Sequence, residues 1–261
     1  MVAGAYVIDE GAGLPVMLCG GLGGNWFDWT GTAAALVERG CRVLSIERPG
    51  YGLGPAPTTD PDLRAEVNRM RSVLDALGVG ERVVAVGHSL GAIYAEGFAR
   101  LYPHRTRALV LLDATVTMRP WRWVPTHLRV ALAHRVGKSV GGTPVQSALA
   151  PAARAVLNQS EPPGGYSDEQ ARDIRRTFRD PLYLETSLVE NASYPLLARQ
   201  LAQLRGVEPL TAHTVVAAAD TGRRTPWSAV WLRRQRTFAR FLRAEFEVVT
   251  PARHHLMIDQ P

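Results

Sequence analysis

The sequence has very little lysine, and its acidic residues do not balance its arginines. Lys138 is the only lysine among 30 basic residues, and the formal net charge at pH 7 is +6. Because the arginines are spread over expected helix surfaces and form no single block, we interpret them as a solvated surface and expect no nucleic-acid partner. The alternative is a basic rim that attracts acidic substrates or lipid head groups, as in a membrane-surface binder.

Cysteine is also scarce, and long apolar runs are missing. Cys19 and Cys41 lie in separate apolar stretches, a pattern that favours two small buried side chains over a disulfide framework or a metal site. No segment approaches the length of a membrane span, and residues 1–9 have neither the basic nor the apolar region of a signal peptide. We therefore expect a cytoplasmic protein with no integral membrane segment, metal or cofactor.

Short β-branched runs alternate with longer amphipathic stretches along most of the chain. This alternation is typical of an α/β fold, in which a mostly parallel central sheet carries helices on both faces. Near-continuous apolar runs indicate strands that are buried on both faces. The expected strands are residues 5–9, 16–19, 42–46, 83–86, 108–112, 214–218 and 247–249. The expected flanking helices are residues 30–39, 62–77, 90–102 and 227–243.

One long region interrupts this alternation. From residue 114 to about residue 205 the strand pattern disappears, and helical patterns separated by proline and glycine breaks replace it. We therefore expect an α/β core made of residues 1–113 and 206–261. Residues 114–205 are expected to form a helical cap over the carboxyl edge of the sheet.

The most specific motif is Gly87-His88-Ser89-Leu90-Gly91, which matches G-x-S-x-G, follows an expected buried strand and opens an expected helix. A serine in so tight a turn is held in a strained backbone conformation, and the two glycines remove side chains that would clash across the turn. The helix N-terminus adds positive partial charge beside the hydroxyl. The motif predicts that Ser89 is a nucleophile.

A serine hydroxyl is a weak nucleophile and needs a base, which in turn needs an acid. His254 and His255 follow the last expected strand, which makes one of them the expected base. Asp220 ends an apolar run and lies between the serine and the histidines in the chain, so we favour it as the acid. Asp113 is the alternative, because it also ends an apolar strand.

An acyl-transfer site also needs preorganised backbone N–H groups that hold the developing oxyanion. Leu90 directly follows the expected nucleophile, and Leu22 lies in the glycine-rich loop 20–24, so their amides are the candidates. A nucleotide-binding interpretation of this loop fails, because Trp26 stands where the third glycine of G-x-G-x-x-G belongs.

Several tryptophans are candidates for an apolar substrate pocket under the cap. They are Trp26, Trp29, Trp121 and Trp123. Pockets for small molecules are lined mainly by apolar and aromatic side chains with a few polar groups. Ordinary packing in the core is the alternative for all of them.

With these motifs the chain resembles the α/β-hydrolase superfamily, in the branch that has a helical cap between its sixth and seventh strands. Besides the serine motif, residues 20–29 look like the family's H-G-x-G-G loop, and residues 47–52 look like its D-x-x-G-x-G turn. Residues 254–261 look like the family's catalytic-histidine segment, in which a proline follows seven residues after the histidine. This last resemblance favours His254 over His255 as the base.

Three residues depart from the family pattern: Gly20 stands where the family usually has histidine, Glu47 replaces the usual aspartate, and Arg253 replaces a frequent glycine before the histidine. An aspartate nucleophile would imply a dehalogenase or an epoxide hydrolase, and Ser89 argues against both. The chain is therefore expected to be a serine hydrolase that cleaves a small or medium apolar carboxylic ester, lactone or thioester. A carbon–carbon bond hydrolase, a cofactor-free peroxidase-like enzyme and a non-catalytic ligand receptor remain the alternatives.

Overall fold

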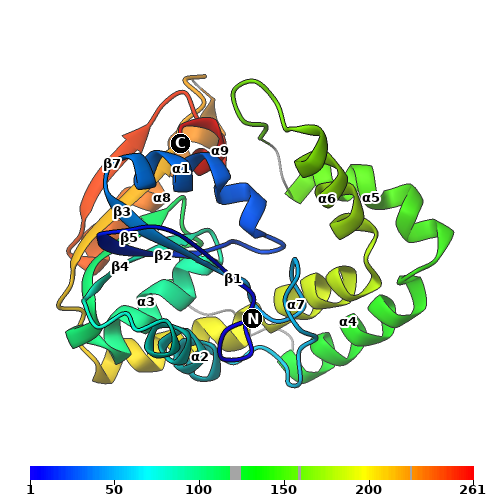
Figure 1. Ribbon diagram of the computed structural model, residues 1–261, viewed down its shortest axis with the longest axis horizontal. Helices are drawn as coiled ribbons and strands as arrows, with labels where there is room; N and C mark the ends of the chain where they lie inside the picture. Colours follow the sequence, from blue (N-terminus) through cyan, green and yellow to red (C-terminus); the bar gives the residue numbers. More distant parts are fainter. Residues whose placement is uncertain (118–124, 158–159, 224) are drawn as a thin grey trace.

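The computed structural model describes residues 1–117, 125–157, 160–223 and 225–261. Its centre is a seven-stranded sheet in the order β1-β3-β2-β4-β5-β6-β7, shown edge-on at the left of Figure 1. β1 pairs antiparallel with β3, and the other neighbouring strands pair in parallel. The strands are β1 (Val7–Gly11), β2 (Leu14–Cys19), β3 (Cys41–Ile46), β4 (Val83–His88), β5 (Thr106–Leu112), β6 (His213–Ala219) and β7 (Glu245–Val249).

The predicted fold class is confirmed, because each expected strand is present and the sheet is mostly parallel. The central strands are almost wholly buried, as their continuous apolar runs indicated. Six of the seven observed strands extend beyond the predicted range by one or two residues at one end or both, and β1 lies two residues further along the chain than predicted. Backbone pairing continues beyond the apolar run that marked each strand, as at His88, which pairs with Leu112.

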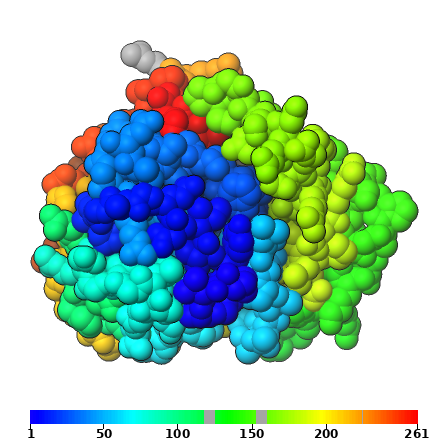
Figure 2. Space-filling model, viewed as in Figure 1, coloured from blue at the N-terminus to red at the C-terminus, as the bar shows by residue number. Residues whose placement is uncertain are grey.

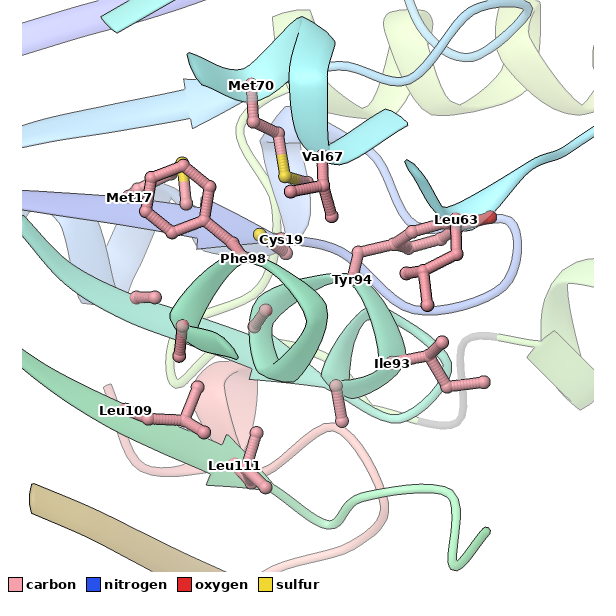
Figure 3. Packing of buried hydrophobic residues seen from close by; sticks show 14 of the residues in the cluster. Met17, Cys19, Leu63, Val67, Met70, Ile93, Tyr94, Phe98, Leu109 and Leu111 are labelled. Carbon is pink, nitrogen blue, oxygen red and sulfur yellow. The ribbon is translucent and has the colours of Figure 1, made fainter. Parts of the chain in front are cut away.

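Helices cover both faces of the sheet. α1 (Thr30–Glu38) and the short α9 (Leu256–Asp259) pack on one face, and α2 (Leu63–Ala76), α3 (Gly91–Leu101) and α8 (Pro226–Leu242) pack on the other. Figure 3 shows α3 between α2 and the strands, with Tyr94 and Phe98 pointing into the largest apolar cluster. α3 is buried nearly all round, so the element that begins just after Ser89 is held rigidly.

The helices α4 (Thr126–Val140), α5 (Pro144–Leu157), α6 (Asp168–Arg179) and α7 (Pro181–Val207) lie between β5 and β6 in the chain. Figure 1 shows them gathered on one side of the sheet, with α4 packed along α7. Leu197, Leu201 and Leu204 of α7 belong to the same apolar cluster as α3. α7 therefore crosses the predicted cap boundary at residue 205, and the cap as a separate unit stays a prediction.

One contact between the α4–α7 region and the core lies at the start of α1. In Figure 2 the yellow-green surface of α6 lies directly against the blue surface of the N-terminal part of the chain. Gln170 of α6 donates a hydrogen bond to Thr30 Oγ1 at 3.2 Å. None of the helices in the described ranges is long and apolar enough to cross a bilayer.

Candidate active site

Ser89 occupies the sharp turn between β4 and α3 with a φ of +51°, a conformation that non-glycine residues rarely adopt. Its amide donates to Leu112 O at 3.0 Å, and its carbonyl accepts from Thr115 N at 3.1 Å. Both partners lie at or just beyond the end of β5. The neighbouring strand therefore holds the strained turn in place, as expected where strain serves a site.

Two glycines make this turn sterically feasible. A Cβ on Gly87 would lie 2.7 Å from Ala92 Cα, and a Cβ on Gly91 would lie 2.3 Å from Cys19 O. Real Cβ atoms do not approach backbone atoms this closely, so no larger residue fits without moving the backbone. The glycines of the G-x-S-x-G motif are thus required by close approach of chain segments.

His254 connects Ser89 to a buried carboxylate. Its Nε2 lies 3.0 Å from Ser89 Oγ, and its Nδ1 lies 2.6 Å from Asp113 Oδ2. The imidazole side chain is 34% exposed, whereas the Asp113 side chain is 3% exposed. With Nδ1–H donating to the carboxylate, Nε2 is the acceptor that faces the serine hydroxyl.

Asp113 directly follows β5 in a turn with a φ of +41°. Its amide donates to Ala217 O at 2.7 Å, which ties the turn to β6. Its Oδ1 accepts from Trp231 Nε1 at 2.7 Å and from Ala219 N at 3.1 Å. These two donors fix the rotation of the carboxyl group, so that Oδ2 faces His254.

The expectation that Asp220 pairs with the histidine is wrong. Asp220 Oδ1 accepts from Gly222 N at 3.2 Å, and its carbonyl accepts from Ala252 N at 2.8 Å, so the residue shapes the turn after β6. β5 lies beside β4 in the sheet, whereas β6 is one strand further from the serine. The carboxylate that reaches His254 is therefore Asp113, the alternative.

Two further histidines surround the loop that carries His254. His88 Nε2–H donates to the His254 carbonyl at 2.8 Å, and the rings of His88 and His255 lie 4.7 and 5.4 Å from the His254 ring. Burial, reinforced by the neighbouring His254, lowers the pKa of His255 to about 3 and that of His88 well below its ordinary value. Both rings are therefore neutral and act as packing partners at physiological pH.

The glycine-rich loop passes close to the serine. A Cβ on Gly21 would lie 2.8 Å from His88 Nδ1 and 3.1 Å from Ser89 Cβ. Within the described part of the chain, the amides of Leu22 and Leu90 donate no backbone or side-chain hydrogen bond. The two predicted donors are thus available to a ligand beside Ser89.

Arg48 fixes the orientation of this loop. Its Nη1 and Nη2 donate to the carbonyls of Gly20 and Gly21, each at 2.6 Å. In a trans peptide the C=O and the following N–H point in opposite directions. The Leu22 N–H, which shares a peptide unit with the Gly21 carbonyl, is therefore directed away from Arg48.

Arg48 is held in turn by a buried network that reaches α7. Its Nε lies 2.7 Å from Glu190 Oε1, and Tyr51 and Tyr94 donate to the same carboxylate at 2.8 and 3.1 Å. Burial beside Glu190 raises the pKa of both tyrosines well above the ordinary value, so they remain donors. Neither Arg48 nor Glu190 was predicted from the sequence, because 142 residues separate them and no local motif joins them.

A cleft of about 1320 Å³ lies beside His254 and Asp113. One wall comes from α8 and the turn before it, one from the histidine loop, and Pro151 and Glu161 of the α4–α7 region also contribute. Its aromatic residues are Trp227 and Trp231 of α8, and its charged rim includes Arg223 and Arg253. Neither of these two tryptophans was predicted to line a substrate pocket.

The four tryptophans that were predicted to line a substrate pocket either lie away from this cleft or fall outside the described residues. Trp29 is 2% exposed and packs in the core under α1, and Trp26 makes an edge contact with Phe27 at 5.8 Å. Neither lines the cleft beside His254. Trp121 and Trp123 fall in the stretch 118–124, which the structure does not describe.

Among the described residues, no cluster of three or more histidine, cysteine, aspartate or glutamate side chains is arranged to hold a metal ion.

The family model described as "Alpha/beta hydrolase family" matches residues 16–261, which is most of the chain. The chain belongs to the alpha/beta hydrolase family. The predicted family resemblance is thereby confirmed.

Relatives within the alpha/beta hydrolase family carry different names. The chain is 34% identical over 110 residues to "Bifunctional epoxide hydrolase 2" of Sus scrofa, a match that covers 41% of this chain and 20% of that protein. It is 36% identical over 110 residues to "2-hydroxy-6-oxo-2,4-heptadienoate hydrolase" of Pseudomonas putida, covering 41% and 39%. The chain thus matches less than half the length of either relative.

Solved alpha/beta hydrolases share the whole fold. A thermophilic esterase from Thermogutta terrifontis superposes with a TM-score of 0.69 over 98% of this chain and 88% of that one. The two sequences are 21% identical, so the likeness shows the fold alone. An alpha/beta hydrolase fold hosts many reactions, and the reaction has to be argued from the site.

Proposed function

We propose that this alpha/beta hydrolase is a serine hydrolase with Ser89 as nucleophile, His254 as base and Asp113 as acid. One observation carries the proposal: the continuous chain of contacts from Asp113 Oδ2 through His254 to Ser89 Oγ, at 2.6 and 3.0 Å. A hydroxyl within reach of an imidazole, which a buried carboxylate orients, is the arrangement that nucleophilic acyl transfer requires.

In the proposed reaction, Ser89 Oγ attacks a carbonyl carbon while His254 Nε2 takes the hydroxyl proton. The imidazolium that forms is stabilised by Asp113 and then gives its proton to the leaving oxygen or sulfur. A water molecule, deprotonated by the same nitrogen, attacks the acyl-enzyme and releases the acid and Ser89. This sequence uses no metal and no cofactor.

The amides of Leu22 and Leu90 are the proposed donors to the tetrahedral oxyanion. Support comes from the absence of competing acceptors in the described chain and from the close approach of Gly21 to Ser89. A preorganised donor stabilises negative charge without reorganising when the reaction occurs, and loss of one donor typically costs two to three orders of magnitude in rate.

The proposed substrate is a small or medium apolar carboxylic ester, lactone or thioester. The cleft supports this class through the apolar surface of Trp227, Trp231 and Pro251, which line it together with His254, and Ser89 itself is not among the lining residues. We also propose that the α4–α7 region acts as a cap, since Pro151 and Glu161 complete the wall of the cleft opposite α8.

Labelling with a fluorophosphonate probe tests the nucleophile directly. We expect the wild-type protein to be labelled and Ser89→Ala to be unlabelled, whereas Ser72→Ala, which changes an exposed serine of α2, is labelled at the wild-type rate. A panel of p-nitrophenyl esters of graded acyl length then tests the substrate class. An unlabelled wild type would contradict the proposal and favour a non-catalytic ligand receptor.

A carbon–carbon bond hydrolase is the second candidate. The observation that favours it is the 36% identity over 110 residues to the Pseudomonas putida protein named 2-hydroxy-6-oxo-2,4-heptadienoate hydrolase. Epoxide opening is disfavoured despite the pig relative, because Ser89 stands where an epoxide hydrolase of this superfamily is expected to carry aspartate. Labelled protein that is inactive on every ester of the panel would support the second candidate.

A further inference from the structure

The excess positive charge of the protein is confined to one stretch of the sequence. Residues 114–160 contain six basic residues and no aspartate or glutamate. The other 24 basic residues are matched by all 24 acidic residues of the chain, so the net charge of +6 belongs to this stretch. Arginines occur along the whole chain, and the charge difference arises because residues 114–160 contain no acidic residue.

The described part of this stretch also presents an apolar stripe to solvent. Leu128, Leu132 and Val136 of α4 are 56%, 62% and 40% exposed, and their spacing of four residues places them along one side of the helix. The opposite side of α4, with Val130 and Ala133, is buried against α7. α4 is therefore apolar on two faces, and only one of them has a partner among the described residues.

Basic side chains flank this stripe. At 100° per residue, Arg129 lies on one side of the stripe and Arg135 on the other, and the exposed Lys138 lies one turn further along on the Arg135 side. Asp60 and Glu185, two acidic groups beside α4, are both bound by His134, at 2.8 and 2.7 Å. Two further exposed apolar residues, Val145 and Leu149, follow at the start of α5.

We infer that the outer face of α4, defined by Leu128, Leu132 and Val136 with Arg129, Arg135 and Lys138, docks on an anionic lipid surface. A helix with an apolar side and flanking arginine or lysine lies in the plane of a membrane interface, with the apolar side chains immersed and the basic groups at the head groups. Each basic residue near an anionic surface contributes about 1 kcal/mol.

Two other occupants fit this face less well. A nucleic acid would satisfy the basic side chains through its phosphates, but it would leave the leucine stripe exposed to water. A second copy of the chain could bury the stripe, but an isologous contact would bring Arg129 and Arg135 of the two copies together without an acidic partner on α4. A lipid surface satisfies both the charge and the apolar stripe.

Cosedimentation of the full chain with lipid vesicles tests this inference, and it does not depend on the proposed hydrolase activity. We expect binding to vesicles of equimolar phosphatidylglycerol and phosphatidylcholine at low salt, and little binding to phosphatidylcholine alone. Added salt should weaken the binding by screening the charges.

Paired variants separate the two contributions. Arg129→Gln/Arg135→Gln/Lys138→Gln should lower the partition coefficient by on the order of a hundredfold, because three contributions of about 1 kcal/mol are lost. Leu128→Ser/Leu132→Ser should lower it at least about tenfold. The matched controls are Arg172→Gln/Arg175→Gln/Arg176→Gln on α6, and Val207→Ser/Val230→Ser on α7 and α8. These side chains are exposed except that of Arg129, which is half-buried and donates to Asn191 O at 3.5 Å, and the controls should bind as the wild type does.

Several outcomes would overturn the inference. One is a wild type that does not bind anionic vesicles at low salt, and another is binding of the α4 variants that equals that of the controls. A dimer seen by sedimentation velocity and abolished by Leu128→Ser/Leu132→Ser, without vesicle binding, would assign the face to a second copy. Binding of a DNA oligonucleotide that displaces the vesicles and survives the leucine changes would assign it to nucleic acid.

Discussion

The carboxylate of Asp113 is almost fully buried, and three hydrogen-bond donors contact it. The Ala219 amide and the Trp231 indole bind Oδ1, and His254 binds Oδ2. A buried carboxylate needs such donors, because an ion that is removed from water and left unpaired costs several kcal/mol. The arrangement makes Asp113 both the most constrained residue of the site and the one whose loss has the clearest expected effect.

The first prediction compares the two aspartates. Asp113→Asn should lower kcat for ester hydrolysis by about four orders of magnitude, because an amide at this position favours the wrong imidazole tautomer. Asp220→Asn should keep kcat within a few fold of the wild type, since Asp220 only shapes a turn. Steady-state kinetics of the two purified variants measure this, and equal losses in both would contradict the assignment.

The second prediction concerns the indole that binds the carboxylate. Trp231→Phe removes one donor from Asp113, and a hydrogen bond to a charged group is worth about 1.5–3 kcal/mol, so kcat should fall about tenfold or more. Phe241→Leu changes an exposed aromatic residue of the same helix that does not line the cleft, and it should leave kcat unchanged. Equal kcat values for Trp231→Phe and the wild type would show that the indole does not position the acid.

The sequence predicted Ser89 from a local motif, and it predicted His254 from a position after the last strand together with the family resemblance, which favoured it over His255. It did not predict the acid, because chain order does not report strand order. Asp113 and Asp220 both end apolar strands, and the choice between them depends on which strand lies beside β4. A single sequence contains no direct record of that neighbour relation.

Among the elements, the loop between β2 and α1 carries Leu22, the proposed oxyanion donor, close to Ser89. Gly21 brings the backbone against Ser89, and Arg48 turns the carbonyls of Gly20 and Gly21 away from the site. The arginine is fixed by Glu190 of α7, so an element of the predicted cap helps to orient the loop. The position of this loop therefore depends on the packing of α7.

The third prediction places a methyl group in this loop. Gly21→Ala would put Cβ within 2.8 Å of His88 Nδ1 and 3.1 Å of Ser89 Cβ, so the loop must shift and carry the Leu22 amide with it. We expect kcat to fall about a hundredfold, the typical cost of one misplaced oxyanion donor. Gly80→Ala is the matched control, because its Cβ would meet no atom within 4 Å. Unchanged kcat in Gly21→Ala would argue against a role for this loop.

Whether a segment forms a strand or a helix was largely predictable, because the spacing of apolar residues and the local composition are properties of short segments. The strands and the helices α1, α2, α3 and α8 follow from β-branched runs and from apolar spacing. The tertiary position of α7 was not predictable in the same way. Its buried Glu190 pairs with an arginine from a distant turn, and that interaction leaves no periodic pattern in the sequence.

At the scale of the whole molecule, two buried neutral histidines should make stability depend on pH. The pKa of His88 and of His255 is lowered in the folded state, to about 3 for His255, whereas an unfolded histidine titrates near 6.5. Below about pH 6.5 the unfolded chain therefore binds protons that the folded protein does not. The stabilisation from these neutral rings is fully present above that pH and is lost as the pH falls.

The fourth prediction follows from this linkage. The free energy of unfolding should decrease between about pH 6 and pH 5, with a slope that approaches about 1.4 kcal/mol per pH unit for each buried histidine. His255→Gln should make the slope shallower by roughly that amount, and His127→Gln, which changes an exposed histidine, should not. Urea denaturation at closely spaced pH values measures the slopes. A wild-type slope of zero would contradict the buried neutral state.

α7 is one continuous helix, and this limits where chimeras can be spliced to exchange substrate specificity between members of this family. Near its start Tyr183 donates to Gly23 O at 2.9 Å, at its middle Glu190 binds Arg48, and towards its end Leu201 packs in the core. A chimera spliced at residue 205 would import foreign side chains into the recipient's interior. A splice immediately before Pro181, where α7 begins, would keep the native α7 with its contacts to Arg48 and the core, and it would exchange α4 to α6, including Val130 and Ala133 that pack on α7.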